Sequence, residues 1–257
     1  MTARQRVVER LEDLSFAKLV PSMLTLLGLC SGATAIRFAL SNDWRLAVAA
    51  VICAMLFDML DGRAARMFGA DTRFGAQLDS LADLVSFGVA PSVIVYMWSL
   101  SRLGDAGWIA ALAFCTCSAI RLARFNIQPA RDEGASEANP FFTGLPTPAA
   151  AGLVVLPMLL NFQSDDKMFR SPLFVGSLTA IASVCMVSRL PTPSIKYMHA
   201  PRRFQVAALS GLGIFITLLV AWPWATLTAG MLAYIASIPV GIAAHDKQQA
   251  RESRAQN

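Results

Sequence analysis

Residues 57–91 read FDMLDGRAARMFGADTRFGAQLDSLADLVSFGVAP and carry four of their aspartates on two apolar stretches, two at the end of the first and two at the start of the second. Asp58 and Asp61 end the first stretch, and Asp79 and Asp83 begin the second. An aspartate near the middle of a membrane helix costs about 2.5–3.5 kcal/mol on insertion scales. Four of them on neighbouring helices therefore require a compensating cation or a functional role.

The whole chain has the composition of a membrane protein. Of its 257 residues, 55% are apolar and only 15% are charged, and the mean hydropathy is +0.52. A soluble domain of this length carries more charge, and so high an apolar content excludes a disordered chain. Long apolar stretches recur at about 20–40, 46–66, 75–100, 107–124, 147–162, 172–188, 205–221 and 224–243. Because a span needs about 20 apolar residues, the sequence predicts an all-α polytopic membrane helix bundle of about eight transmembrane helices.

The chain divides into four parts along its length. Residues 1–18 carry apolar positions at helical spacing with arginines between them, which predicts either an amphipathic helix on the membrane surface or a short solvated helix. Residues 19–190 are expected to form the main membrane domain, 191–245 two additional C-terminal transmembrane helices, and 246–257 a tail. Eight spans place both termini on one side, where most of the 22 basic residues lie. The positive-inside rule makes this side the cytoplasm.

Helical geometry groups the four aspartates into two pairs. At 100° per residue, Asp58 and Asp61 lie about 60° apart on one helix, and Asp79 and Asp83 lie about 40° apart on the next. Antiparallel helices joined by a short loop bring both pairs to the same cytoplasmic depth. Ligand sets made only of oxygen favour Mg²⁺ or Mn²⁺, and four carboxylates neutralise two such ions. Since two-metal sites assist displacement at phosphorus, the segment predicts a phosphoryl-transfer site.

Small and basic residues beside the aspartates fit a phosphate ligand. Gly62 and Gly75 leave room on the two helix faces, and Arg66 adds a positive charge for a diphosphate. Two other interpretations are a proton relay in a transporter and aspartates that cap helices. A relay requires polar residues across the membrane, but residues 48–57 and 87–98 carry no charge.

The aspartates belong to a longer pattern with fixed spacings. The motif Asp58-x-x-Asp61-Gly62-x-x-Ala65-Arg66, eight further residues and Gly75-x-x-x-Asp79-x-x-x-Asp83 resembles the full signature of the CDP-alcohol phosphotransferases. The resemblance implies that the four aspartates bind two divalent ions, Mg²⁺ or Mn²⁺, and that Asp83 is also the general base. It implies that the glycines, alanine and arginine of the motif line the nucleotide site together with Thr25 of the first span. Ser22 and Leu29 stand where the family often has asparagines.

Three further stretches resemble the bacterial membrane-integral phosphatidylserine synthases of this family. They are DLVSFGVAP at 83–91, RLARFN at 121–126 and FFTGLPTPAAAG at 141–152. This resemblance implies transfer of a phosphatidyl group from CDP-diacylglycerol to L-serine, which yields phosphatidylserine and CMP. It also implies a homodimer in the bacterial cytoplasmic membrane, in contact with membrane lipids and without a nucleic-acid partner. The same chemistry with glycerol 3-phosphate, inositol phosphate or choline as the acceptor remains open.

The charges of the substrate predict where serine binds. L-Serine is a zwitterion whose carboxylate needs a cation, and Arg121 and Arg124 lie near one helix face at positions i and i+3. Both arginines also fit a topological role or the binding of lipid phosphate. The sequence from Gly144 to Pro148 predicts a rigid turn before the fifth span, which either walls the pocket or starts the helix. The full predicted set is Arg121, Arg124, Ser86, Asn126, Thr143, Gly144 and Pro146.

Overall fold

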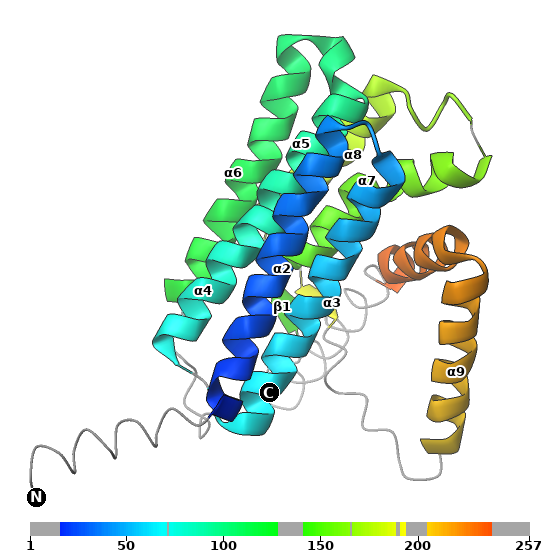
Figure 1. The fold of residues 1–257 in the computed structure, drawn as a ribbon. Coiled ribbons are helices and arrows are strands. Elements are labelled where there is room, and N and C mark those ends of the chain that lie inside the picture. The colour runs from blue at the N-terminus through cyan, green and yellow to red at the C-terminus, as the bar shows by residue number, and fades with distance from the viewer. Residues whose placement is uncertain are drawn as a thin grey trace, which may run out of the picture.

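The computed structural model describes residues 16–70, 72–127, 141–164, 166–188, 191–193 and 205–237. These residues form a bundle of long helices (Figure 1). The predicted surface segment lies outside the described residues up to position 15, and the predicted tail at 246–257 lies outside them entirely.

The helices follow the predicted spans closely. Their bounds are α2 Phe16–Leu40, α3 Trp44–Phe68, α4 Arg73–Asp83, η1 Leu84–Val89, α5 Ala90–Trp98, η2 Leu100–Leu103, α6 Asp105–Ile127, α7 Thr147–Ser164, α8 Pro172–Val187 and α9 Gln205–Ala221. Residues 223–237 form a final helix, and α4, η1 and α5 continue one another as a single span. Within the described ranges, four helices are long and apolar enough to cross a membrane, and α8 is a shorter apolar helix. The predicted polytopic helical membrane bundle is confirmed.

Helices α2 and α3 lie side by side (Figure 1), and η1 packs closely against α2 through small residues. A side chain at Gly32 of α2 would overlap Ser86 of η1, so a glycine is required where these backbones approach. Ser86 donates a hydrogen bond to the carbonyl oxygen of Gly28 at 3.2 Å. These contacts fix η1 against α2, one turn beyond the second aspartate pair.

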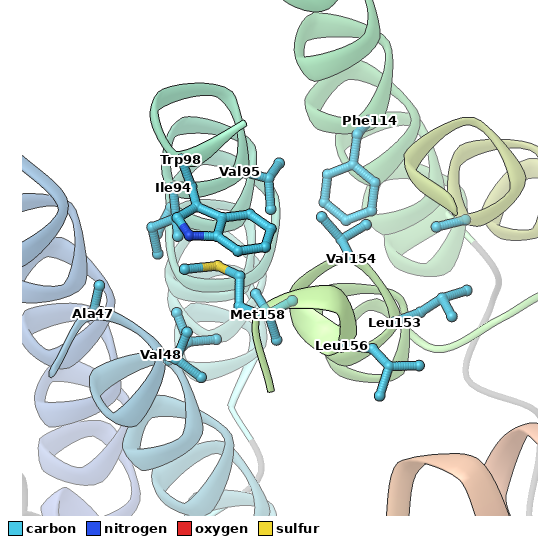
Figure 2. Close-up of a cluster of buried hydrophobic side chains, with 14 of the residues drawn as sticks. Ala47, Val48, Ile94, Val95, Trp98, Phe114, Leu153, Val154, Leu156 and Met158 are labelled. Atoms are coloured by element: carbon cyan, nitrogen blue, oxygen red, sulfur yellow. The ribbon is translucent and has the colours of Figure 1, made fainter. Parts of the chain in front are cut away.

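Helix α7 lies at the centre of the bundle. Figure 2 shows Val154 and Met158 of α7 between Trp98 of α5 and Phe114 of α6, with Val48 of α3 alongside. All five side chains are at most 2% exposed. Dense van der Waals contact of this kind holds membrane helices together, because lipid tails are as apolar as the side chains.

A tight turn before α7 is hydrogen-bonded to the C-terminal end of α8. The three-residue strands β1 (Phe141–Thr143) and β2 (Pro191–Pro193) pair in an antiparallel manner. Gly144 then adopts φ +83°, and the amide of Leu145 donates to the carbonyl oxygen of Cys185 at 3.2 Å. The turn therefore sets the start of α7 against the C-terminal end of α8.

The two C-terminal helices differ in how they meet the bundle. Along α9 nearly every described side chain is exposed, and Figure 1 shows this helix standing apart from the others. The chain reverses at Trp222, and the final helix packs on the main core through residues that include Trp224, Met231 and Tyr234. Of the described parts of these two helices, the second packs on the main core.

Candidate active site

The ends of two helices bring the aspartate pairs together. Helix α3 stops at Gly69, which adopts the left-handed conformation with φ 57°. Helix α4 starts three residues later with Thr72 as its N-cap, where the amide of Gly75 donates to Thr72 Oγ1 at 3.0 Å. The short connection places the C-terminal end of α3 beside the N-terminal half of the next span.

The predicted aspartates converge at this junction. Asp58, Asp61 and Asp79 each offer one carboxylate oxygen, and these oxygens all lie within 4.8 Å of one another. Asp83 lines the same cavity and lies in hydrogen-bonding contact with the Asp58 carboxyl group. The cavity volume is about 180 Å³ when the part that is open to solvent is included. Such a concentration of acidic oxygens is suited to a hard divalent cation.

Thr25 supports one of the carboxylates from α2. Its hydroxyl donates to Asp61 Oδ2 at 2.7 Å, and Asp61 is only 5% exposed. Thr25 also lines the cavity. The structure therefore places this predicted nucleotide-site residue against a carboxylate, where it fixes the orientation of Asp61.

The remaining walls of the cavity are small or apolar. They are formed by Gly28, Ala54, Ala82, Ser86 and Phe87. Ser86 and Phe87 belong to η1, a π-helical turn that directly follows Asp83. A π-turn inserts an extra residue into the helical repeat and is frequent at functional sites. The sequence pattern is interpreted with the periodicity of a regular α-helix, which cannot predict a π-turn.

The predicted nucleotide residues lie beside the cavity. The motif residues Gly62, Ala65, Arg66 and Gly75 do not line the enclosed part of it. Arg66 is exposed, and the position that a side chain on Gly62 would occupy is open space. Gly75 lies in the first turn of α4, and its amide donates to the N-cap residue Thr72. This margin has the room and the charge for a ligand larger than the cavity itself.

The two predicted arginines point to different partners. Arg121 Nη1 donates to Thr147 Oγ1 at 2.8 Å, and the guanidinium interacts electrostatically with Asp83. Arg124 Nη1 donates to the carbonyl oxygen of Val187 at 3.1 Å, at the end of α8. Arg121 is thus the one of the pair that faces the aspartates.

The other predicted acceptor residues have structural contacts. Asn126 Oδ1 accepts a hydrogen bond from Ser80 at 2.9 Å, which ties α6 to α4. A side chain at Gly144 would lie 2.9 Å from the carbonyl oxygens of both Met186 and Ser188. Pro146 is half-buried, and the side chain of Thr143 is outside the described part of the chain.

Sequence reasoning did not assign two residues near Arg121. Thr147 is fully buried and holds the guanidinium, and the prolines on either side of it were the available signal. Tyr234 interacts electrostatically with Arg121 from the final helix. A tyrosine in a long apolar stretch carries no signal of its own, because only the folded chain brings it to the site.

Comparison with known proteins places this site in a family. The CDP-alcohol phosphatidyltransferase family matches residues 18–188, and a second group, CDP-alcohol phosphatidyltransferase 2, matches residues 206–239. The chain belongs to the CDP-alcohol phosphatidyltransferase family.

Several relatives in this family have a named activity. A CDP-diacylglycerol–serine O-phosphatidyltransferase of Mycobacterium leprae is 36% identical over 88% of this chain and 75% of the relative. Proteins of the same name from Helicobacter pylori strain 26695 and Methanocaldococcus jannaschii are 33% and 40% identical. The matches cover 84% of this chain and 88% of the H. pylori protein, and 73% of this chain and 77% of the M. jannaschii protein.

Proposed function

We propose that this protein is a CDP-diacylglycerol–serine O-phosphatidyltransferase. It transfers the phosphatidyl group of CDP-diacylglycerol to L-serine and releases CMP and phosphatidylserine. The convergence of four aspartates in one cavity, beside the half-buried side chain of Arg121, carries this proposal. The activity named for relatives that match most of this chain supports it.

The carboxylates fit the divalent cations on which this family generally depends. Oxygen ligands of one octahedral Mg²⁺ lie at most about 4.2 Å apart, which is twice the usual bond length. The three oxygens of Asp58, Asp61 and Asp79 lie within 4.8 Å of one another, so small side-chain rotations close the difference. With Asp83, the set would hold two ions, either Mg²⁺ or Mn²⁺. Bound there, the ions would neutralise the diphosphate and stabilise the departing CMP.

Asp83 and Arg121 have different roles in the reaction. Asp83 accepts the proton of the serine hydroxyl as that oxygen attacks the phosphorus next to diacylglycerol. The new oxygen–phosphorus bond forms while the bond from this phosphorus to the oxygen of CMP breaks. Arg121 binds the serine carboxylate and so places the hydroxyl beside Asp83. The reaction is expected to be direct, without a covalent enzyme intermediate.

The two ends of the lipid substrate require different surroundings. The cytidine diphosphate lies at the exposed margin formed by Gly62, Ala65, Arg66 and Gly75, and the acyl chains remain in the bilayer. The enzyme acts in the bacterial cytoplasmic membrane, with the site and both termini facing the cytoplasm, and it forms a homodimer. The distribution of basic residues in the sequence supports this orientation.

Another acceptor alcohol is the alternative to serine. A phosphorylated acceptor would favour a larger basic cluster, and choline would favour an aromatic cage without an arginine. A half-buried guanidinium near the aspartates instead suits a small acceptor that carries one carboxylate.

The test measures CMP release by the purified protein in detergent. CDP-diacylglycerol and Mg²⁺ or Mn²⁺ are supplied with serine, glycerol 3-phosphate, inositol phosphate or choline, one acceptor at a time. We expect metal-dependent release with serine alone. Release with a different acceptor would refute the serine assignment, and no release with any acceptor would favour the transporter interpretation.

A further inference from the structure

Arg121 has more hydrogen-bond donors than the described structure satisfies. Its Nη1 atom donates to Thr147, but its Nε atom is buried and has no hydrogen-bond partner among the described residues. A guanidinium carries five N–H donors, and buried donors are normally paired. The guanidinium therefore has donors free for a further hydrogen-bond acceptor, and the side chains packed around it determine its orientation.

The final helix reaches this arginine by following α7. The ring of Trp224 meets Phe162 edge-on, with centroids 5.0 Å apart, and Gln163 donates to Thr228 Oγ1 at 2.7 Å. Further along, the sulfur of Met231 lies 3.0 Å from the position that a Cβ atom on Gly152 would occupy. The contacts thus progress from the C-terminal end of α7 toward its start.

Tyr234 is the next residue on this face. It follows Met231 by three positions, so the two side chains are neighbours on the helix surface. It is half-buried and packs on the main core. It also interacts electrostatically with Arg121, whose partner Thr147 begins α7. The final helix therefore places the phenol of Tyr234 near Arg121, the arginine that faces Asp83.

We propose that Tyr234 is a positioning residue that holds the Arg121 guanidinium toward Asp83, so that the C-terminal helix contributes to acceptor recognition. The inference rests on the proposed function, in which Arg121 binds the carboxylate of the acceptor. A phenol oxygen can accept a hydrogen bond from a guanidinium, whereas a phenylalanine at this position could only pack against it. A tyrosine is thus able to fix the direction of the charge as well as to fill space.

The effect should appear in the affinity for the acceptor. The proposed metal ligands and the proposed general base belong to α3 and α4, not to the final helix. Loss of the phenol oxygen would leave Arg121 charged but less well directed. The expected result is a higher KM for serine, with the chemical step largely retained.

The experiment compares Tyr234→Phe with the unaltered full-length enzyme. We expect the KM for serine to rise about threefold to tenfold, the size expected when a polar interaction with a charged side chain is lost. The KM for CDP-diacylglycerol and kcat at saturating serine should stay within about twofold. Tyr96→Phe is the matched control, because Tyr96 packs edge-on against Trp108 at 5.1 Å near the other end of the bundle and should behave like the unaltered enzyme.

A double-mutant cycle with Arg121→Lys separates positioning from packing. If Tyr234 acts through the guanidinium, Tyr234→Phe should change the KM for serine by less than about twofold once the arginine is gone. An unchanged KM for serine in the single variant would overturn the inference and leave the proposed function standing. Equal losses for both substrates, with a lower unfolding temperature, would reduce Tyr234 to a packing role and overturn it too. Failure of the proposed function would instead appear in the unaltered enzyme, as CMP release that does not require serine.

Discussion

The carboxylate of Asp61 lies in an enclosed position and has a dedicated hydrogen-bond donor. It is 5% exposed, and the hydroxyl of Thr25 occupies one side of Oδ2 at 2.7 Å. A hydroxyl that donates to a ligating carboxylate fixes its direction and leaves the other lone pairs for a cation. The geometry of the site therefore depends on the residues that hydrogen-bond to the aspartates as well as on the aspartates themselves.

Replacing Thr25 by Val removes this hydroxyl with little change in shape. We expect the Mg²⁺ or Mn²⁺ concentration for half-maximal CMP release to rise about 10- to 100-fold, as for other outer-shell partners. Saturating metal should restore most of the rate, and Thr25→Ser should resemble the unaltered enzyme. A metal titration of activity measures this, and an unchanged midpoint in Thr25→Val would remove Thr25 from the metal site.

The aspartates themselves should be far less tolerant. Asp83→Asn removes the proposed base and should lower kcat by at least about 100-fold, and Asp58→Asn should cause a comparable loss through the metal site. The control is Asp43→Asn, at the start of α3, where the side chain makes no capping hydrogen bond. Turnover is followed by CMP release, with an unfolding scan to check the fold. Near-normal turnover in either site variant would contradict the assignment.

At the scale of helices and turns, the chain divides into features that the sequence predicts and features that it does not. The predicted stretches 46–66 and 107–124 became α3 and α6, because a long, continuous apolar run in a membrane satisfies its backbone hydrogen bonds within a helix. The aspartate pairs were equally predictable from helical spacing. The π-turn of η1 and the approach of Tyr234 to Arg121 depend on contacts with distant elements, so no local pattern carries them.

The turn before α7 allows a test of backbone geometry. Gly144 has φ +83°, and a Cβ atom there would lie 2.9 Å from two carbonyl oxygens. Gly144→Ala should therefore destabilise the protein by about 1–3 kcal/mol, the usual cost of backbone strain. Gly213→Ala on α9 is the control, because open space surrounds that position. Thermal unfolding in detergent compares the two, and equal unfolding temperatures would show that the turn tolerates a side chain.

The whole molecule has a site end and an opposite end, and their basic residues differ in function. At the opposite end, the Arg170 guanidinium lies 5.8 Å from the Trp98 ring centroid and that of Arg45 lies 5.8 Å from the Phe162 centroid. These cation–π contacts explain the presence of Arg170 and Arg45, so neither arginine needs a role in membrane topology. The larger excess of basic residues in the sequence falls on the site side, which the positive-inside rule assigns to the cytoplasm.

Reporter fusions in a bacterial host test this orientation directly. Alkaline phosphatase becomes active only in the periplasm, where its disulfides form, so a fusion after residue 257 should be inactive there. A fusion after Gly104, between α5 and α6, follows three spans and should be active. Green fluorescent protein at the same two positions should give the reverse pattern. The site would then face the cytoplasm, where CMP is released and serine is supplied, whereas an active phosphatase at the C-terminus would invert the molecule and place the aspartates outside.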